Sequence, residues 1–254
     1  MQNSEMSGSD NITLLTDNGR FVVVSYNMHG FNQGLEGTKE IIHKLCPDVI
    51  ALQEHWLTPA NLCKLSEVSS DYFCCGSSSM TNVLAAGPLI GRPYGGTALL
   101  INNRLANHTV NLVCNDRFTA VLLADYLVIS AYMPCSGTSD RVNLYSAIIS
   151  ELQAVIEDHA QYKLILCADL NTEIDVPSSV SDLVNNFLHI NNLQRHDLLH
   201  PTANRYTYIH ELQHAASCID YIVSSADLSS VAFNVLDLDI NLSDHLPIMC
   251  VFFV

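Results

Sequence analysis

The sequence predicts an α/β fold in which helices flank two packed β-sheets. Apolar β-branched runs recur along the 254 residues, and amphipathic helical segments separate several of them. The composition is 48% hydrophobic, which is enough for a large core. No repeat, low-complexity tract or linker divides the chain, so we expect a polar tail over residues 1–20 and one domain over residues 21–254.

The first half of the expected domain mixes strands with short helices. We predict strands at 21–27, 48–54 and 72–76 and helices at 35–46 and 58–68. The first helix stops before Pro47, and the second opens on Thr58-Pro59, which fits an N-cap followed by proline at the first helical position. The segment from Gly76 to Gly96 is rich in Ser, Gly and Pro, so we expect a loop that carries partner or substrate contacts.

The second half is richer in strands. Strands are predicted at 95–102, 110–114 and 120–134, and their short spacing favours antiparallel neighbours. The clearest helix, 140–159, must lie on a sheet because its apolar face comprises Val142, Tyr145, Ile148, Ile149, Leu152, Val155 and Ile156. The remaining expected elements are a strand at 163–171, a helix at 180–190 and strands at 205–210, 218–225, 231–240 and 245–254.

Charge and composition narrow the classes of function. With 26 acidic against 11 basic residues, the net charge of −15 repels nucleic acid and anionic membranes at long range. This counts against a DNA-binding protein unless some of the acids are held at a metal site. No apolar run approaches the roughly 20 residues of a membrane helix, so we expect no membrane partner.

The cysteines and the N-terminus favour an intracellular protein. The nine cysteines are scattered and show no C-x-x-C spacing, so we expect reduced thiols. The first residues, "MQNSEMSGSDNITLLTDNG", lack the basic start and apolar stretch of a signal peptide. A reducing, intracellular location is therefore predicted.

Polar side chains end or interrupt several of the predicted apolar strands. Burying an unpaired carboxylate costs several kcal/mol unless a cation or donors compensate it, and strand ends form ligand crevices in sheet proteins. Taken singly, each residue has an ordinary explanation, such as a solvated Glu, an Asx turn or a core histidine. Together they predict one site, composed of Asn27, Glu54, Tyr132, Asp169, Asn171, Asp220, Asp244 and His245.

In this order the motifs resemble those of the endonuclease/exonuclease/phosphatase superfamily. They stand as "SYN", "LQE", "AYMP", "ADLN", "CIDYI" and "LSDHLP", and the resemblance spans about residues 21–254. It implies a DNase I-like four-layer α/β sandwich and a phosphodiester hydrolase. Oxygen ligands suit Mg²⁺, so Mg²⁺, or else Mn²⁺, is the expected cofactor.

The resemblance also implies the roles of the metal and water ligands. Glu54 would bind the metal with Asn27 beside it, and Asp244 would lie near the metal or its water shell. Asp169 would orient or deprotonate the attacking water, and Asn171 would contact the phosphate.

Further roles follow for the residues that face the substrate. Tyr132 would lie near the leaving group or the phosphate, and His245 would donate to a phosphate oxygen while Asp220 orients its ring. Thr207 and Ser217 occupy positions that in related nucleases lie near the nucleic-acid backbone, so they are predicted to bind DNA.

Within the superfamily, the chain is most similar to the endonuclease domain of non-LTR, LINE-type retrotransposons. "LQEHWL", "SDHLPI" and Ser217 carry this resemblance, while His29 and Cys135 depart from the motifs of abasic-site repair enzymes. It implies an enzyme that nicks double-stranded DNA in the nucleus, leaves a 3′-hydroxyl primer and precedes a reverse transcriptase domain of the same polyprotein. An apurinic/apyrimidinic repair endonuclease, a small-molecule or lipid phosphoesterase and an inactive binding module are alternatives.

Overall fold

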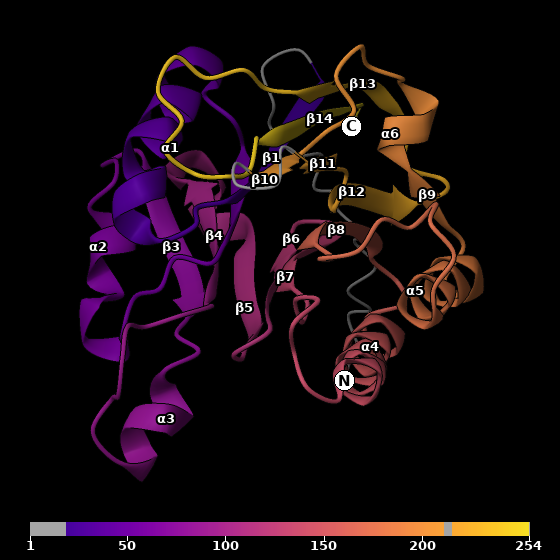
Figure 1. The fold of residues 1–254 in the computed structure, drawn as a ribbon. Coiled ribbons are helices and arrows are strands. Elements are labelled where there is room, and N and C mark those ends of the chain that lie inside the picture. Colours follow the sequence, from indigo (N-terminus) through magenta and orange to yellow (C-terminus); the bar gives the residue numbers. More distant parts are fainter. Residues whose placement is uncertain (1–18, 211–214, 254) are drawn as a thin grey trace, which may run out of the picture.

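Two six-stranded β-sheets pack face to face in the computed structural model, which describes residues 19–210 and 215–253 (Figure 1). In the first sheet, β1 is parallel to β2 and every other neighbouring pair is antiparallel. Arg20, expected in the tail, is the first residue of this sheet's strand β1, and residues 1–18 lie outside the described range. Its spatial order is β13 (Ser230–Val235), β14 (Ile248–Phe253), β1 (Arg20–Asn27), β2 (Val49–Gln53), β4 (Thr97–Asn102) and β3 (Tyr72–Ser77).

The second sheet has one parallel pair at its centre. Its order is β5 (Thr109–Cys114), β6 (Phe118–Leu123), β7 (Tyr126–Tyr132), β8 (Lys163–Asp169), β12 (Asp220–Ser225) and β9 (Leu193–Arg195). β7 and β8 are parallel, whereas β5, β6 and β7 are antiparallel neighbours, which confirms the expectation from their short spacing. Ala124, with φ 50°, lies in the turn that divides the run 120–134 into β6 and β7. A separate antiparallel pair joins β10 (Tyr208–His210) to β11 (Ala215–Ser217).

Helices cover the outer face of each sheet. Ile41 of α1 (Phe31–Leu45) packs against the first sheet, and Leu152 and Phe187, from α4 (Arg141–Asp158) and α5 (Ser179–Ile190), pack against the second. Helix, sheet, sheet and helix are the four layers of the DNase I-like α/β sandwich, so the predicted fold class is confirmed (Figure 1). The other helical segments are η1 (Pro59–Asn61), α2 (Cys63–Ser66), α3 (Thr81–Ala86), η2 (Asn103–His108) and α6 (His196–Leu199). Within the described ranges, every helix is too short or too polar to cross a bilayer.

The central strands are buried on both faces, which explains their continuous apolar runs. In β1, Phe21 and Val23 belong to the core between the sheets, while Val24 and Tyr26 belong to the core beneath α1. Burying one such side chain contributes roughly 1.5–3 kcal/mol. The strands are therefore fixed along their length, and the polar residues at their ends are held at a defined edge.

Helix α1 begins at Phe31 and not at residue 35 as predicted. Its first turns contain Gly34 and Gly37, and glycine weakens the sequence pattern of a helix. A Cβ on Gly34 would lie only 2.5 Å from the Cβ of Met28. The close contact between α1 and the residue after β1 therefore requires Gly34. The same glycine weakens the helical sequence pattern, which is why the start of the helix was not predicted.

Three other expectations for helices and loops were wrong. The predicted helix 58–68 is split into η1 and α2, and the predicted loop from Gly76 to Gly96 contains α3. Val142, expected on the apolar face of helix 140–159, is 44% exposed because the buried residues of α4 begin one turn later, at Tyr145.

The C-terminal strands are shorter than predicted. The predicted strand 205–210 is reduced to β10 (Tyr208–His210), and the predicted strand 231–240 is replaced by β13 (Ser230–Val235). The predicted strand 245–254 is replaced by β14 (Ile248–Phe253). β14 begins directly after Pro247, which has no N–H for the ladder. His245 therefore precedes the final strand and does not lie in it.

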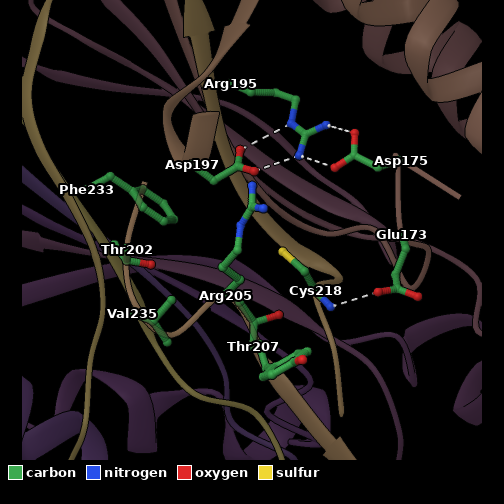
Figure 2. Close-up of a pocket in the computed structure, with 11 residues that line it drawn as sticks. Glu173, Asp175, Arg195, Asp197, Thr202, Arg205, Thr207, Cys218, Phe233 and Val235 are labelled. Carbon is green, nitrogen blue, oxygen red and sulfur yellow. Dashed lines mark hydrogen bonds and ion pairs between the residues drawn. The ribbon is translucent and has the colours of Figure 1, made fainter. Parts of the chain in front are cut away.

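Two elements that the sequence did not predict, β9 and α6, meet at Arg195. Its guanidinium pairs with Asp175 and Asp197, each at 2.6 Å (Figure 2). It also lies 5.2 Å from the ring centroid of Tyr221. Arg195, Asp175 and Asp197 line a cavity of about 170 Å³, and the two carboxylates neutralise the guanidinium there. A strand of three residues and a helix of four are too short to produce a periodic pattern.

Candidate active site

The topology brings the polar ends of several strands to one edge of the sandwich. Tyr132 ends β7 opposite Asp169, which ends β8, and Asp220 begins β12 opposite Asp169 on its other side. Asn27 ends β1, and Glu54 directly follows β2. A cleft of about 650 Å³, here called the main cleft, opens at this edge. The predicted site residues that line it are Glu54, Tyr132, Asp169, Asn171, Ser217, Asp244 and His245.

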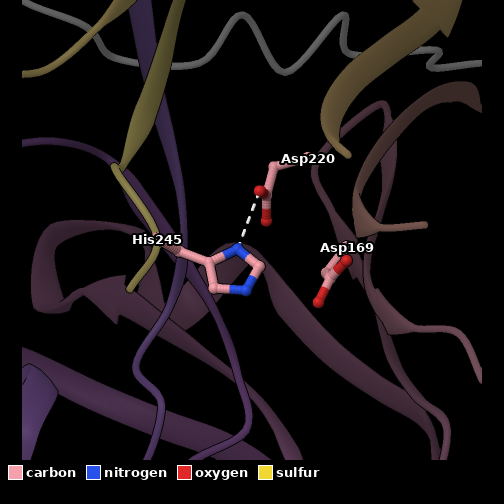
Figure 3. A group of neighbouring side chains, drawn as sticks. All are labelled: Asp169, Asp220 and His245. Carbon is pink, nitrogen blue, oxygen red and sulfur yellow. Dashed lines mark hydrogen bonds and ion pairs between the residues drawn. The ribbon is translucent and has the colours of Figure 1, made fainter. Parts of the chain in front are cut away.

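Asp220 and His245 form a buried pair at the base of the main cleft (Figure 3). His245 Nδ1 lies 2.8 Å from Asp220 Oδ2. Burial alone would lower the pKa of His245, but the charge and hydrogen bond of Asp220, followed by the charge of Asp169, raise it above its ordinary value. The ring therefore keeps its proton at neutral pH, with Nδ1–H bound to Asp220 and Nε2–H left to donate.

Asp169 is 1% exposed and is held by two asparagines. Asn27 Nδ2 donates to its Oδ2 at 2.8 Å, and the backbone N–H of Asn171 donates to its Oδ1, also at 2.8 Å. Asn171 has φ 49°, and its side chain donates to the carbonyl of Met133 at 2.9 Å. Burial, followed by the charge of Asp220, raises the pKa of Asp169. The carboxylate is thus fixed in orientation and is more basic than an ordinary aspartate.

Glu54 lies between Trp56 and Tyr132. Trp56 Nε1 donates to Glu54 Oε2 at 3.2 Å, and both residues have left-handed backbones, with φ 52° for Glu54 and 53° for Trp56. Such a conformation costs roughly 1–2 kcal/mol per residue, and strain of this kind gathers at functional sites. Burial, followed by the charges of Glu54 and Asp169, raises the pKa of Tyr132, so its hydroxyl keeps its proton.

Asp244 contacts His29 at the mouth of the main cleft. His29 Nδ1 lies 2.9 Å from Asp244 Oδ1, and the backbone N–H of His29 donates to Asn27 Oδ1 at 2.9 Å. Burial opposes ionisation of Asp244, but the hydrogen bond from His29 and the charge of His245 lower its pKa. Asp244 is therefore an ionised carboxylate, and His29 links it to Asn27 by contacting both residues.

Thr207 does not offer the DNA contact predicted for it. It is 1% exposed, and its Oγ1 accepts hydrogen bonds from the backbone N–H groups of Ile219 and Asp220, each at 3.1 Å. Its carbonyl accepts from Leu246 N at 2.7 Å. Thr207 thus joins the start of β12 to the segment that carries His245. Asp220 itself, predicted in the middle of a strand, is the first residue of β12, and the preceding Ile219 N–H donates to Thr207 and not to a neighbouring strand.

Ser217, the other predicted DNA-binding residue, ends β11 and is half-buried in the wall of the main cleft. Its carbonyl accepts from Thr207 N at 3.0 Å. The side chain therefore faces the space where a substrate would lie, while its backbone supports Thr207.

Sequence reasoning missed Arg141, His29 and Trp56 as parts of the site. Arg141 is the first residue of α4, where a cation is unfavourable to the helix dipole, and this anomaly was visible in the sequence. Its Nε donates to the carbonyl of Pro134 at 2.9 Å and its Nη2 to the carbonyl of Asn171 at 2.6 Å. Arg141 thereby clamps the loop after β7 to the loop after β8. For His29 and Trp56, only their closeness to Asn27 and Glu54 was visible.

The chain matches the family model described as "Endonuclease/Exonuclease/phosphatase family" over residues 24–245. No curated protein matches it. Among solved structures, a 3′ phosphatase, NExo, from Neisseria bound to product DNA hairpin is similar at 17% identity with a TM-score of 0.69, covering 91% of this chain and 98% of that one.

Two further solved structures are similar at low identity. An AP endonuclease from Archaeoglobus fulgidus is 16% identical with a TM-score of 0.67, and the match covers 92% of this chain and 100% of the other. The AP endonuclease LMAP from Leishmania major is 14% identical with a TM-score of 0.71, covering 92% of this chain and 88% of the other. At these identities the likeness establishes the fold.

Proposed function

Since the chain belongs to the endonuclease/exonuclease/phosphatase family, we propose that it is a metal-dependent phosphodiesterase that nicks double-stranded DNA and leaves a 3′-hydroxyl. The observation that carries this proposal is the arrangement at the base of the main cleft. A protonated imidazole and a buried, basic carboxylate lie together there, with ligand atoms of Asp169, Asp220 and His245 within 4.8 Å of one another. One group serves as a hydrogen-bond donor to phosphate and the other as an acceptor for the proton of water.

In the proposed reaction, water attacks phosphorus in line with the departing 3′ oxygen. Asp169 accepts the proton of that water, and its two asparagine donors keep the carboxylate aimed. His245 donates from Nε2 to a phosphate oxygen while Asp220 stabilises its positive charge. Tyr132, whose hydroxyl keeps its proton, supplies a donor for the departing 3′ oxygen, and the phosphate stays on the 5′ end of the downstream strand.

A divalent cation fits the main cleft because its carboxylates outnumber its cations. Burial raises the pKa of Asp169 first, and the charges of Asp220 and Glu54 add to it. Glu54 faces the cleft and has no basic partner among the described residues, so we assign the ion to Glu54, with Asn27 and Asp244 beside it. Asp220 is less suitable because it is committed to His245. When bound, Mg²⁺ or Mn²⁺ would neutralise the charge that develops on the phosphate and the leaving oxygen.

Within this activity we propose a retrotransposon endonuclease, acting in the nucleus and followed in its polyprotein by a reverse transcriptase domain. Support comes from the sequence motifs that resemble LINE-type endonucleases and from Ser217, a small polar residue in the wall of the main cleft. A pocket for an abasic sugar would favour a bulky aromatic side chain at that position. A polar wall suits the backbone of intact DNA better.

The test is nicking of supercoiled plasmid with Mg²⁺, with Mn²⁺ and with EDTA. Nicked circles should form only with metal, and a DNA polymerase should extend them without prior phosphatase treatment because the product carries a 3′-hydroxyl. His245→Ala and Asp169→Ala should each reduce the rate at least 10²-fold. His43→Ala, an exposed histidine of α1, is the matched control and should keep full activity.

Three outcomes would contradict the proposal. Absence of nicking with both metals would exclude the endonuclease. A preference of more than about tenfold for an abasic duplex over an intact one would assign the enzyme to DNA repair. Hydrolysis of an inositol phosphate or a choline lipid by a protein that leaves DNA intact would replace DNA by a small-molecule or lipid substrate.

A further inference from the structure

Three arginines around the main cleft have no carboxylate partner within the described residues. Five other basic side chains are ion-paired, namely Lys39, Lys44, Arg104, Lys163 and Arg195. Arg92, Arg117 and Arg141 each lie over an aromatic ring instead, at 4.7, 5.9 and 5.6 Å from the centroids of Trp56, Tyr132 and Tyr145. In a protein with a net charge of −15, three arginines without carboxylate partners, of which Arg141 lines the main cleft, require an explanation.

Arg92 is the most exposed of the three and connects directly to the proposed metal ligand. It belongs to the segment between Gly76 and Gly96, and its guanidinium lies over Trp56, whose Nε1 donates to Glu54 Oε2 at 3.2 Å. Trp56 also contacts His29, with ring centroids 4.8 Å apart. The indole of Trp56 therefore lies between the exposed guanidinium of Arg92 and the carboxylate of Glu54 at the main cleft.

Hydrogen bonds hold this segment in place. Trp56 N donates to the carbonyl of Gly95 at 2.9 Å, and Gly96 N donates to Ser79 Oγ at 2.8 Å. Ser79 Oγ in turn donates to the carbonyl of Asp116 at 2.8 Å, next to Arg117. Ser79 therefore joins the segment of Arg92 to the residue before Arg117, beside the main cleft, and the cation–π contact orients the guanidinium of Arg92 in advance.

We propose that Arg92, held on Trp56, binds a phosphate of the DNA backbone other than the one that is cleaved. This inference rests on the proposed function and adds a substrate-binding residue to it. A guanidinium presents planar paired donors that match a phosphate group, and it costs little ordering when an aromatic ring already supports it. A small phosphodiester that fills only the main cleft would not reach Arg92, whereas a polynucleotide strand would.

The test compares Arg92→Gln and Arg92→Lys with the wild type. Affinity for a duplex oligonucleotide is measured by fluorescence anisotropy in EDTA over a range of KCl concentrations, and cleavage is measured with Mg²⁺. Arg92→Gln should weaken binding about tenfold at low salt and reduce the slope of log K against log[KCl] by about 0.9. Its kcat on DNA should be nearly unchanged, while KM rises. Arg92→Lys should keep the slope because it keeps the charge.

The controls separate this inference from the function on which it rests. Lys163→Gln removes the same charge at the far end of β8 and should leave DNA binding unchanged. Hydrolysis of bis-p-nitrophenyl phosphate should be equal in the wild type and Arg92→Gln. If wild type cleaves DNA but Arg92→Gln binds it with the same slope, the inference alone is overturned. If Arg92→Gln also loses activity on the small diester, Arg92 acts through Trp56 and Glu54 and the inference is again wrong.

A wild type that hydrolyses the small diester but neither binds nor cleaves DNA would overturn the proposed function itself. Arg92-dependent binding to phosphatidylserine vesicles, together with unchanged DNA binding, would assign this cation to a membrane surface and likewise overturn the inference.

Discussion

Replacing Thr207 by Val tests how the site is held together. Valine has nearly the same shape as threonine but cannot accept hydrogen bonds. In the wild type, Thr207 Oγ1 accepts from the backbone N–H groups of Ile219 and Asp220, each at 3.1 Å, and the residue is 1% exposed. The substitution therefore leaves two buried donors without an acceptor at the start of β12.

The size of the effect follows from those two bonds. A buried donor left unsatisfied costs roughly 1–3 kcal/mol, so Thr207→Val should lower the free energy of unfolding by about 2–6 kcal/mol. For a chain of 254 residues, each kcal/mol corresponds to roughly 2–4 °C in Tm, so we expect a fall of at least about 4 °C. Asp220 shifts with its backbone and orients His245 less well, so kcat should also fall.

The assay measures Tm by calorimetry and kcat and KM for nicking of DNA. A positioning residue predicts a lower kcat with nearly constant KM, and Thr207→Ser should restore both stability and kcat because it keeps the hydroxyl. A DNA-contacting threonine predicts the opposite, an unchanged Tm with a raised KM and a smaller salt slope. That second pattern would refute the structural argument and reinstate the role predicted from the sequence.

Two further predictions concern protonation. Asp220→Asn removes the charge that raises the pKa of His245, so His245 should lose its proton at neutral pH. When kcat is measured from pH 5.5 to 9, it should fall at least 10²-fold near pH 7.5 and partly recover at acid pH. An unchanged pH profile would contradict the assigned pair. His55 is fully buried, and burial lowers its pKa to about 4. Since an unfolded histidine titrates near 6.5, its contribution to stability is complete above about pH 6.5 and is lost as pH falls towards 4, by about 1.4 kcal/mol per pH unit. Urea unfolding at pH 7, 6 and 5 should give a shallower decline for His55→Gln than for the wild type, and equal slopes would contradict this.

The sequence predicted two packed sheets flanked by helices because the strands are buried on both faces and appear as continuous apolar runs. It also predicted which residues end those runs, since polarity and position along a strand are local properties. Tyr132 and Asp169 meet because their strands are parallel neighbours, and Asp220 joins them because its strand runs the opposite way. The grouping of these three residues therefore needed only the strand order.

What the sequence could not supply was the set of contacts between distant polar groups. Thr207 sits in a polar segment that suits a surface loop, and only the folded chain places its hydroxyl on the backbone of Asp220. Arg141 and Trp56 lie outside any strand end, and their partners are a carbonyl after β8 and a carboxylate after β2. Hydrogen bonds of this kind depend on loop conformation, which composition and periodicity do not encode.

The net charge of −15 counts against a DNA substrate at long range, but salt limits the range of electrostatic forces. At 0.1 M salt the Debye length is about 10 Å, so a bound strand responds mainly to the charges on the walls that it touches. Among the described residues, Arg141 in the wall of the main cleft and Arg92 and Arg117 beside it have no carboxylate partner, while the acids of the main cleft are the groups that a divalent cation would neutralise. Removing the metal should therefore weaken DNA binding as well as stop cleavage, because the carboxylates of Glu54 and Asp244 would then repel the phosphate. Anisotropy measured in Ca²⁺ and in EDTA separates the two effects. Equal affinity in both would show that the acids of the cleft do not act on the bound strand, and the assignment of the metal to Glu54 would then be wrong.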